Sequence, residues 1–351
     1  MRVLQVDSGR EWRGGQNQVR LLCRELAGRA EVENHLLTAA GSVLAVRARA
    51  AGAAVVETSW RAGLSPTAFL ALRRAVARLR PEVVHAHDSH ALSLALWLRR
   101  ARPRLVPAPY AVIAHRRVHL HVKPGSGWHR ADRVIAVSQG VERMLVEDGL
   151  PERAVVVIPD GVDPDEIRTA ARSVSDIRRR LGLPDAAPLA VNAGALGEDK
   201  DQCTLVRAAA RARSRAPDLH WVIAGEGPLR AALDAEIRAL GVGDIVHLAG
   251  YVDPVDALIA EARVFVMSSR DEGFGSVVLH AQVLGVPVVS TAAGGLTELV
   301  PADRLTPLGD PGALAAKVVD ALEHPSPTAL DPRFTAKSMA QSVLAQYRLF
   351  V

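Results

Sequence analysis

Short apolar runs alternate with longer stretches of helical periodicity along the whole chain. Strands that alternate with helices are typical of parallel sheets with right-handed crossovers, so the pattern predicts doubly wound α/β domains. In the first half, the expected strands are Val3–Val6, His35–Thr38, Ala54–Glu57, Val83–Ala86, Ala111–Ala114, Arg133–Val137 and Val155–Ile158. The expected helices between them include Gln16–Ala27, Pro66–Leu79 and Gly140–Asp148.

The same pattern starts again in the second half. Its expected strands are Leu189–Ala193, His220–Ala224, Ile245–Ala249, Val264–Met267 and Val286–Ser290, and its expected helices are Thr204–Arg215, Leu229–Leu240 and Val255–Ala262. The polar segment 160–188 separates the halves, and a proline-rich segment (324–332) precedes a last helical stretch (337–350). We therefore predict two Rossmann-like domains (1–168 and 169–331) facing across a cleft, with a C-terminal helix (332–351) that returns to the first. In open α/β sheets, ligands bind beyond the carboxyl ends of the strands.

Composition adds few constraints to this picture. A chain of 351 residues, 49% hydrophobic and 23% charged, fits a globular protein of two domains. No apolar run reaches the roughly 18 residues that a membrane-spanning helix needs, and MRVLQVDSG contains no signal-peptide core. Cys23 and Cys203 are too few for a disulfide framework. These features predict a cytoplasmic protein.

The net charge of +5 comes mainly from arginine, with clusters at Leu72–Arg80 and Leu98–Arg104. Such clusters are compatible with peripheral contact at the inner face of an anionic membrane. The alternative is that they are only the solvated faces of two crossover helices. Nucleic acid is not an expected partner, because aromatic residues make up 4% of the chain and no aromatic platform accompanies the charge.

The segment 268–298 contains the densest chemical signal. Glu272 precedes Gly273, Phe274 and Gly275, and an apolar helix follows from about Ser276 to Leu284. Glycines let the backbone approach a ligand closely, and the free N–H groups at the start of a helix favour negative charge. A buried strand then ends near a second glycine pair, Gly294 and Gly295. This arrangement predicts a site for a polyanion.

Several further segments keep a recognisable order along the chain. They are Gly14-Gly15, EVVHAHD (82–88), His115, ADRVIAVS (131–138), IPDGVD (158–163), GALGEDKD (194–201), IAGEGPLR (223–230) and LAGYV (248–252). Together with segment 268–298, they make nearly the whole chain resemble the retaining glycosyltransferases of family four, which have the GT-B fold. The resemblance implies transfer of a hexose-type sugar from a nucleotide diphosphate to an acceptor hydroxyl.

The resemblance also implies roles for individual residues. Lys200 is expected to bind the donor phosphates, Glu272 the hydroxyls of the donor sugar, and His115 to steady the reacting sugar through a partial positive charge. Further donor contacts are expected from Gly14, Gly15, Gly273, Phe274, Gly275, Ser276, Gly294 and Gly295. Nucleotide contacts are expected from Gly225, Gly227, Tyr251, Val252 and His280. By their position around the expected cleft rather than by the resemblance, Arg13, His87 and Arg116, with Asp7 and Arg10, are candidates for contact with the acceptor.

Two positions depart from the family pattern. The second glutamate of the family motif, which grips the nucleotide ribose, is His280 here, and Ala195 replaces the usual phosphate-binding arginine. A neutral imidazole offers one acceptor and one donor, whereas a carboxylate accepts two hydroxyl hydrogen bonds. These departures keep open a non-catalytic paralogue that binds nucleotide sugars. A sugar-nucleotide epimerase of GT-B fold is a third hypothesis.

The expected co-substrate is a UDP-, GDP- or ADP-sugar, with no cofactor and no metal. The basic first domain is compatible with a lipid-linked or envelope polysaccharide acceptor, and a soluble small-molecule acceptor is the alternative. The twelve histidines prompt a metal hypothesis. His85 with His87, and His119 with His121, have the spacing of residues on one strand face. No third ligand of convincing spacing accompanies either pair, so no metal site is predicted.

Overall fold

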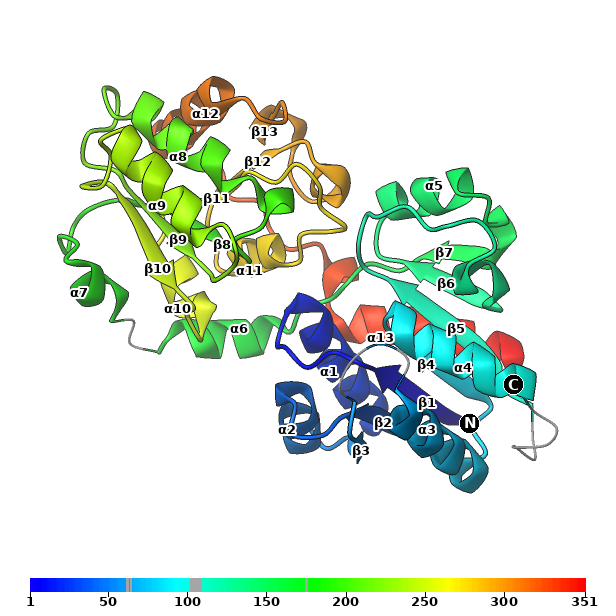
Figure 1. Cartoon of the computed structure of the whole chain (residues 1–351). Coiled ribbons are helices and arrows are strands. Elements are labelled where there is room, and N and C mark those ends of the chain that lie inside the picture. The colour runs from blue at the N-terminus through cyan, green and yellow to red at the C-terminus, as the bar shows by residue number, and fades with distance from the viewer. Residues whose placement is uncertain (61–62, 64, 102–108, 174–175) are drawn as a thin grey trace. The chain divides into compact units, whose positions relative to one another are not determined.

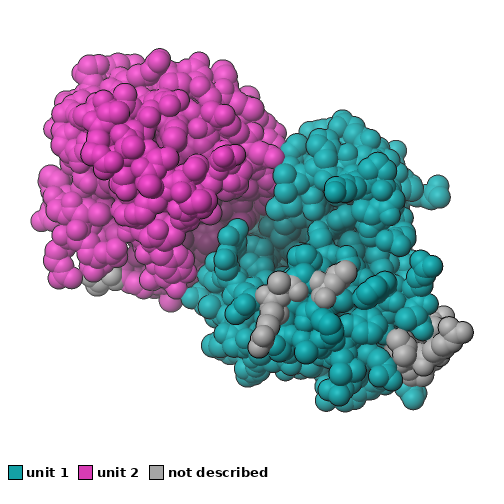
Figure 2. All heavy atoms as spheres, viewed as in Figure 1, with its two compact units in different colours: residues 1–161, 332–351 teal, residues 162–331 magenta. Residues whose placement is uncertain are grey.

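The computed structural model of the protein describes residues 1–60, 63, 65–101, 109–173 and 176–351. The chain forms two compact units, one made of Met1–Gly161 with Pro332–Val351 and the other of Val162–Asp331 (Figure 2). The carboxyl end of the arginine cluster at Leu98–Arg104 lies outside the described residues. No helix in the described part of the chain is long and apolar enough to span a membrane.

The first unit is built on a parallel sheet of seven strands in the order β3-β2-β1-β4-β5-β6-β7 (Figure 1). The strands are β1 (Arg2–Asp7), β2 (Glu33–Ala39), β3 (Ala54–Thr58), β4 (Val83–Ala86), β5 (Ala111–Arg116), β6 (Arg133–Ala136) and β7 (Val155–Val157). The helices are α1 (Gly14–Ala27), α2 (Val43–Ala50), α3 (Pro66–Leu79), α4 (Ser89–Ala101), α5 (Gln139–Glu147) and α13 (Ala336–Tyr347).

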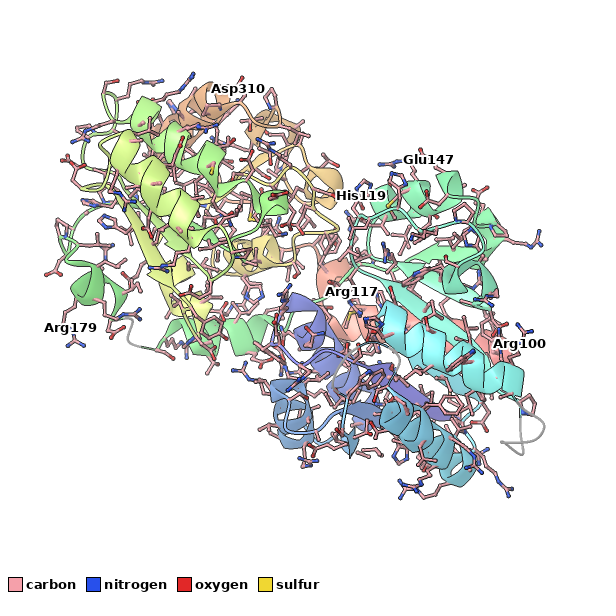
Figure 3. The ribbon with its side chains drawn as sticks, viewed as in Figure 1. Arg100, Arg117, His119, Glu147, Arg179 and Asp310 are labelled. Atoms are coloured by element: carbon pink, nitrogen blue, oxygen red, sulfur yellow. The ribbon has the colours of Figure 1, made fainter. Side chains whose placement is uncertain are left out.

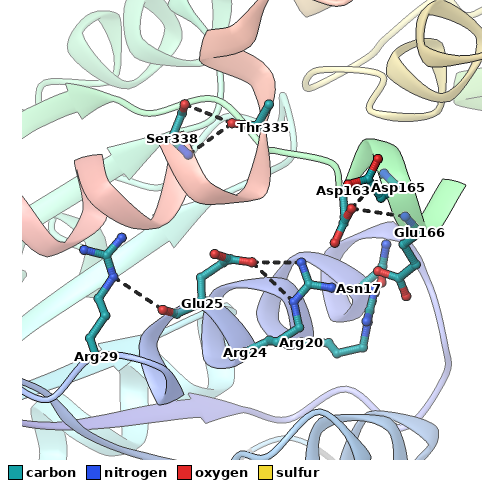
Figure 4. Close-up of polar contacts among 10 residues, drawn as sticks. All are labelled: Asn17, Arg20, Arg24, Glu25, Arg29, Asp163, Asp165, Glu166, Thr335 and Ser338. Atoms are coloured by element: carbon teal, nitrogen blue, oxygen red, sulfur yellow. Dashed lines mark hydrogen bonds and ion pairs between the residues drawn. The ribbon is translucent and has the colours of Figure 1, made fainter. Parts of the chain in front are cut away.

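The C-terminal helix α13 is part of this first unit. It packs against α1, and its residues Met339, Val343 and Tyr347 share a buried core with Val3 of β1 and Ile113 of β5. The Thr335 side chain caps the helix by accepting the Ser338 N–H at 3.2 Å (Figure 4). Because apolar residues of α13 fill the core beside the sheet, the last helix completes a domain that the first residues of the chain begin.

The second unit is built on a parallel sheet of six strands in the order β10-β9-β8-β11-β12-β13. The strands are β8 (Leu189–Ala193), β9 (His220–Ala224), β10 (Val246–Gly250), β11 (Val264–Met267), β12 (Val288–Thr291) and β13 (Leu305–Thr306). The helices are α6 (Pro164–Ala171), α7 (Ile177–Leu181), α8 (Gln202–Ala212), α9 (Arg230–Ala239), α10 (Val255–Ala260), α11 (Val277–Val283) and α12 (Pro311–Glu323).

The division between the units follows Gly161, earlier than the expected boundary after residue 168. Helix α6 is the reason, because it packs against α10 and α11 of the second unit. Asp163 begins this helix by accepting the N–H groups of Asp165 and Glu166 at 2.9 and 3.1 Å (Figure 4). The helix signal was therefore present in the sequence as an aspartate cap followed by Pro164.

Both sheets are doubly wound and parallel, as the alternating pattern predicts. Their central strands are buried on both faces; in β1, every residue from Val3 to Asp7 is buried. The carboxyl ends of parallel strands meet at one edge of each sheet, and the polar side chains described below lie at these edges.

Candidate functional site

In the second unit, the loops after β8 and β11 bring Lys200 and Glu272 together. Lys200 Nζ lies 2.7 Å from Glu272 Oε2 and 3.3 Å from Asp199 Oδ2. Both partners of the closer pair are largely buried, with side-chain exposures of 20% and 12%. Burial alone would lower the pKa of Lys200, but the carboxylates of Glu272 and Asp199 raise it above its usual value. The site therefore holds one fixed ammonium group in a partly dehydrated loop.

The glycine pair after β12 supports the Glu272 loop from behind. Gly295 N donates to Glu272 O at 3.0 Å. A Cβ atom on Gly294 would lie 2.1 Å from Glu272 O, and the φ angle of Gly294 is +44°. The bare backbone at this pair therefore has a structural reason, the close packing of two loops. Direct contact of the pair with a ligand stays a prediction.

The expected N–H donors at the start of α11 are fewer than the sequence pattern indicates. The N–H groups of Val278 and Leu279 donate to the carbonyls of Gly275 and Ser276 at 2.9 and 3.1 Å. Gly275, with φ +85°, turns the chain into the helix. Any anion would therefore meet the amides that precede Val278 rather than a full helical turn.

His280 on α11 is bound to a carboxylate that the sequence pattern did not indicate. Its Nδ1 lies 2.6 Å from Oδ1 of Asp256, the buried second residue of α10. A carboxylate oxygen beside Nδ1 leaves Nε2 as the ring nitrogen that can meet a ligand. This position therefore provides one ring nitrogen held by Asp256, where the family pattern has two carboxylate oxygens.

The loops expected to contact the nucleotide pack tightly on the loop after β8. A Cβ atom on Gly225 would lie 1.9 Å from Gly194 O, and one on Gly227 would lie 2.4 Å from Leu196 O. Gly225 N donates to Gly250 O at 2.8 Å. Beside this contact, the Tyr251 side chain is 57% exposed. The two glycines bring three strand-end loops together, and the tyrosine ring lies on the surface next to them.

In the first unit, Arg117, which is labelled in Figure 3, contacts three buried side chains. Its guanidinium lies 3.2 Å from His87 Nδ1, 3.0 Å from His115 Nδ1 and 3.1 Å from Asp160 Oδ1. Burial first, and then the Arg117 charge, lower the pKa of His115 well below its usual value. His115 is therefore neutral, and the expected positive charge at this point belongs to Arg117. The sequence indicated Arg116 as an acceptor candidate and gave no sign of this role for Arg117.

Strand pairing supplies the third histidine that spacing alone did not reveal. His85, His87 and His115 each offer a nitrogen within 4.8 Å of the others. However, Nδ1 of His87 and of His115 face Arg117, and His87 Nε2 lies 2.8 Å from Gln5 Oε1. A metal would have to displace these partners beside a guanidinium charge, so the cluster does not fit a cation. His119 and His121 lie in a loop after β5, not on a strand.

The remaining expected residues of the first unit are dispersed. Arg13 is exposed and paired with Glu11. Arg116 is buried, stacks over Trp128 and donates to Leu120 O, and burial lowers its pKa. Arg10 is exposed. Gly14 and Gly15 begin α1, and Gly15 lies close enough to Arg117 that a Cβ atom would be 3.9 Å from Arg117 Cδ.

Asp7 is buried at the end of β1, where its carboxyl accepts the Gly9 N–H at 2.8 Å. Burial, and next the carboxylate of Asp88, raise the pKa of Asp7 to about 6 from 3.8. The folded state thus holds this proton more tightly than the unfolded chain. Its stabilising effect is present at acidic pH and is lost as pH rises from about 4 to 6.

Replacing Asp7 by asparagine is expected to remove the loss of stability that accompanies deprotonation of Asp7. From pH 4 to pH 7, the free energy of unfolding of the variant should rise relative to wild type by about 1–3 kcal/mol. Calorimetric melting across this range measures the difference, with the exposed Asp185→Asn as the control. Parallel pH curves for Asp7→Asn and wild type would contradict the assignment.

Comparisons with known proteins identify the family. Residues 12–166 match the family described as Glycosyltransferase Family 4, and residues 187–324 match Glycosyl transferases group 1. A 2-deoxystreptamine N-acetyl-D-glucosaminyltransferase of Streptomyces fradiae is 30% identical over 79% of this chain and 70% of that protein. The chain belongs to glycosyltransferase family 4.

A second relative and a solved structure extend the comparison. A 2-deoxystreptamine glucosyltransferase of Streptomyces kanamyceticus is 28% identical over 82% of this chain and 79% of that protein. The crystal structure of Anabaena Alr3699/HepE in complex with UDP and glucose superimposes with a TM-score of 0.82. At 20% identity, covering 99% of this chain and 100% of that chain, it shows the fold. This chain is therefore a glycosyltransferase of GT-B fold, as the sequence resemblance predicts.

Proposed function

We propose that the protein transfers a hexose from a UDP-sugar to an acceptor hydroxyl with retention of configuration and without a metal. The single observation that carries this proposal is the Lys200–Glu272 pair at 2.7 Å, placed at the strand-end edge of the second unit. An ammonium beside loop amides can hold a diphosphate and stabilise it further as the glycosidic bond breaks. The choice of uridine is supported by Alr3699/HepE, whose crystal structures contain UDP, UDP-glucose and glucose.

The proposed step breaks the bond between the sugar C1 and the diphosphate oxygen. The acceptor oxygen forms the new bond to C1 on the same face, and its proton passes to an oxygen of the leaving diphosphate. Glycosidases retain configuration with a carboxylate nucleophile about 5–5.5 Å from the acid. Here Lys200 would neutralise the leaving group, and Glu272 would accept hydrogen bonds from sugar hydroxyls. His280 Nε2 would bind a ribose hydroxyl.

The acceptor is proposed to be a polyhydroxylated ring. Relatives named for 2-deoxystreptamine and for D-inositol 3-phosphate support this class, and a relative from Mycolicibacterium smegmatis is named for a phosphatidylinositol monomannoside. Because of the Mycolicibacterium smegmatis relative, the proposed acceptors include an envelope glycolipid. Peripheral membrane contact also stays a prediction; Trp97 on α4, 59% exposed beside Arg100, is compatible with it.

Product analysis tests the proposed reaction. Purified protein, UDP-glucose or UDP-N-acetylglucosamine, EDTA and a panel of acceptors (2-deoxystreptamine, inositol 3-phosphate and a phosphatidylinositol mannoside) should yield UDP and an α-linked product. Proton NMR of the anomeric centre reads the configuration. A β-linked product would exclude retention, and activity that EDTA abolishes would exclude metal independence.

The same assay addresses the non-catalytic paralogue, which Ala195 and the His280–Asp256 pair favour. A pure binding protein would show thermal stabilisation by UDP-sugar but release no free sugar, even without acceptor. An epimerase would return a changed sugar on the nucleotide. Either result would replace the transferase proposal.

A further inference from the structure

Arg117 determines which nitrogens donate and which accept in the buried cluster around it. A guanidinium has five N–H donors and no acceptor, so each nitrogen that faces it must carry a lone pair. Arg117 faces Nδ1 of His87 at 3.2 Å and Nδ1 of His115 at 3.0 Å. Both rings are neutral, because the pKa of each histidine lies well below its usual value, and burial is the main cause. Both protons therefore lie on Nε2.

The chain of hydrogen bonds continues from His87 through Gln5 to Tyr347 of the C-terminal helix. His87 Nε2–H donates to Gln5 Oε1 at 2.8 Å, which fixes the orientation of the Gln5 amide. Gln5 Nε2 then donates to the Tyr347 hydroxyl at 3.0 Å, and Tyr347 Oη lies 2.6 Å from His85 Nδ1. The tyrosine proton has two acceptors within reach, His85 Nδ1 at 2.6 Å and Gln5 Oε1 at 3.5 Å. Helix α13 is thereby tied into the cluster.

Two ring nitrogens of this network, His85 Nε2 and His115 Nε2, lack a hydrogen-bond partner among the described residues, and Arg117 fixes the proton on the second of them. His115 Nε2 has no hydrogen-bond partner among the residues that the structure describes, although the His115 side chain is 1% exposed. An unpaired buried N–H is costly unless a ligand or water completes it. His115 is the next-to-last residue of β5, at the strand-end edge where ligands of such sheets bind.

We propose that Arg117 is a positioning residue that holds His115 as a neutral imidazole with its proton on Nε2, ready to donate to a hydroxyl of the transferred sugar. The charge that stabilises the reaction on this side is then fixed on Arg117 and does not depend on protonation of the histidine. For its effect on turnover, this inference rests on the proposed function; the tautomer itself does not.

Nitrogen-15 NMR of histidine-labelled protein tests the tautomer without any reaction. The His115 signals, assigned by their loss in His115→Asn, should show an unprotonated Nδ1 and a protonated Nε2 from pH 5.5 to 8.5. In Arg117→Met, the onset of His115 protonation should move to higher pH, because the neighbouring positive charge is gone. A wild-type signal with the proton on Nδ1 would overturn the proposal.

Kinetics test the positioning role. Arg117→Met is expected to lower kcat/KM roughly tenfold to a hundredfold, since a misplaced contact at the reacting sugar costs about that much. The matched control is Arg179→Met, an exposed arginine on α7 (Figure 3). Wild-type kinetics in Arg117→Met would overturn the role even if the NMR result holds. If wild type itself transfers no sugar, the proposed function fails while the tautomer stands or falls by NMR alone.

A second pair of variants keeps the test usable if Arg117→Met folds poorly. Removal of the arginine leaves Asp160 buried without its partner, which destabilises a protein by several kcal/mol. The double variant Arg117→Met/Asp160→Asn removes both charges, and Asp160→Asn alone retains the arginine. Asp160→Asn should keep the wild-type tautomer of His115, and the double variant should show the altered protonation and the loss of kcat/KM. Equal behaviour of these two variants would contradict the assignment to Arg117.

Discussion

Replacing Lys200 by methionine is expected to lower kcat by a hundredfold or more. Methionine keeps the apolar stem of the side chain but removes the ammonium that lies 2.7 Å from Glu272. Loss of one preorganised electrostatic contact to a developing charge typically costs about a hundredfold to a thousandfold. The change also leaves the Glu272 carboxylate largely buried and unneutralised beside the proposed diphosphate. Steady-state kinetics of UDP release measures the effect.

Lys337→Met is the matched control for this variant. Lys337 is exposed on α13, so its replacement should leave both kcat and KM within about twofold of wild type, as surface changes usually do. A cycle with Glu272→Gln adds a second criterion. Because Lys200 and Glu272 contact each other, the double variant should lose less activity than the product of the two single losses. Near-wild-type turnover in Lys200→Met would exclude the proposed role of the lysine.

The repeated strand and helix pattern was enough to predict the architecture. The expected strands lie within two residues of the observed ones, because parallel strands buried on both faces are short continuous apolar runs. The sequence analysis missed α12, although it is 13 residues long, and also β13, which is two residues long, and α2, whose apolar and polar residues are not segregated on two faces. Short elements carry too little periodicity to be recognised.

Candidate residues that belong to a local sequence motif were easier to predict than contacts between distant elements. Lys200 and Glu272 follow from motifs, and the structure brings them together. Arg117, Tyr347 and Asp256 could not be inferred, because their partners are set by strand pairing and helix packing. Arg116 and Arg117 illustrate the limit: adjacent residues point to opposite sides of an extended chain, and no spacing rule told which one faces the histidines.

The roles of the glycines also changed once the contacts were known. The sequence pattern treats Gly225, Gly227, Gly294 and Gly295 as points where backbone meets a ligand. In the structure, each of them has backbone of a neighbouring loop within 2.6 Å of its would-be Cβ. The family motif therefore contains residues that build the loops as well as residues that would touch the donor, and only a variant can separate the two.

Gly294→Ala is expected to destabilise the second unit and to remove donor binding. A methyl group here would lie 2.1 Å from Glu272 O, so the loop that carries Glu272 must move, and φ of +44° adds backbone strain. Overpacking costs about 1–3 kcal/mol, and alanine in a left-handed conformation costs about 1–2 kcal/mol more. We therefore expect a fall of about 2–5 kcal/mol in the free energy of unfolding, measured by denaturant titration.

The variant Gly285→Ala is a control that distinguishes backbone strain from the steric clash of the added methyl group. Gly285 also has a positive φ, +69°, but a Cβ atom there would meet nothing within 4 Å. This control should lose only the strain contribution, about 1–2 kcal/mol, and should bind UDP as wild type does. Gly294→Ala should bind UDP at least tenfold more weakly in calorimetric titration, even under conditions where it is fully folded. Equal stability and equal UDP affinity in the two variants would show that the Glu272 loop does not depend on the glycine behind it.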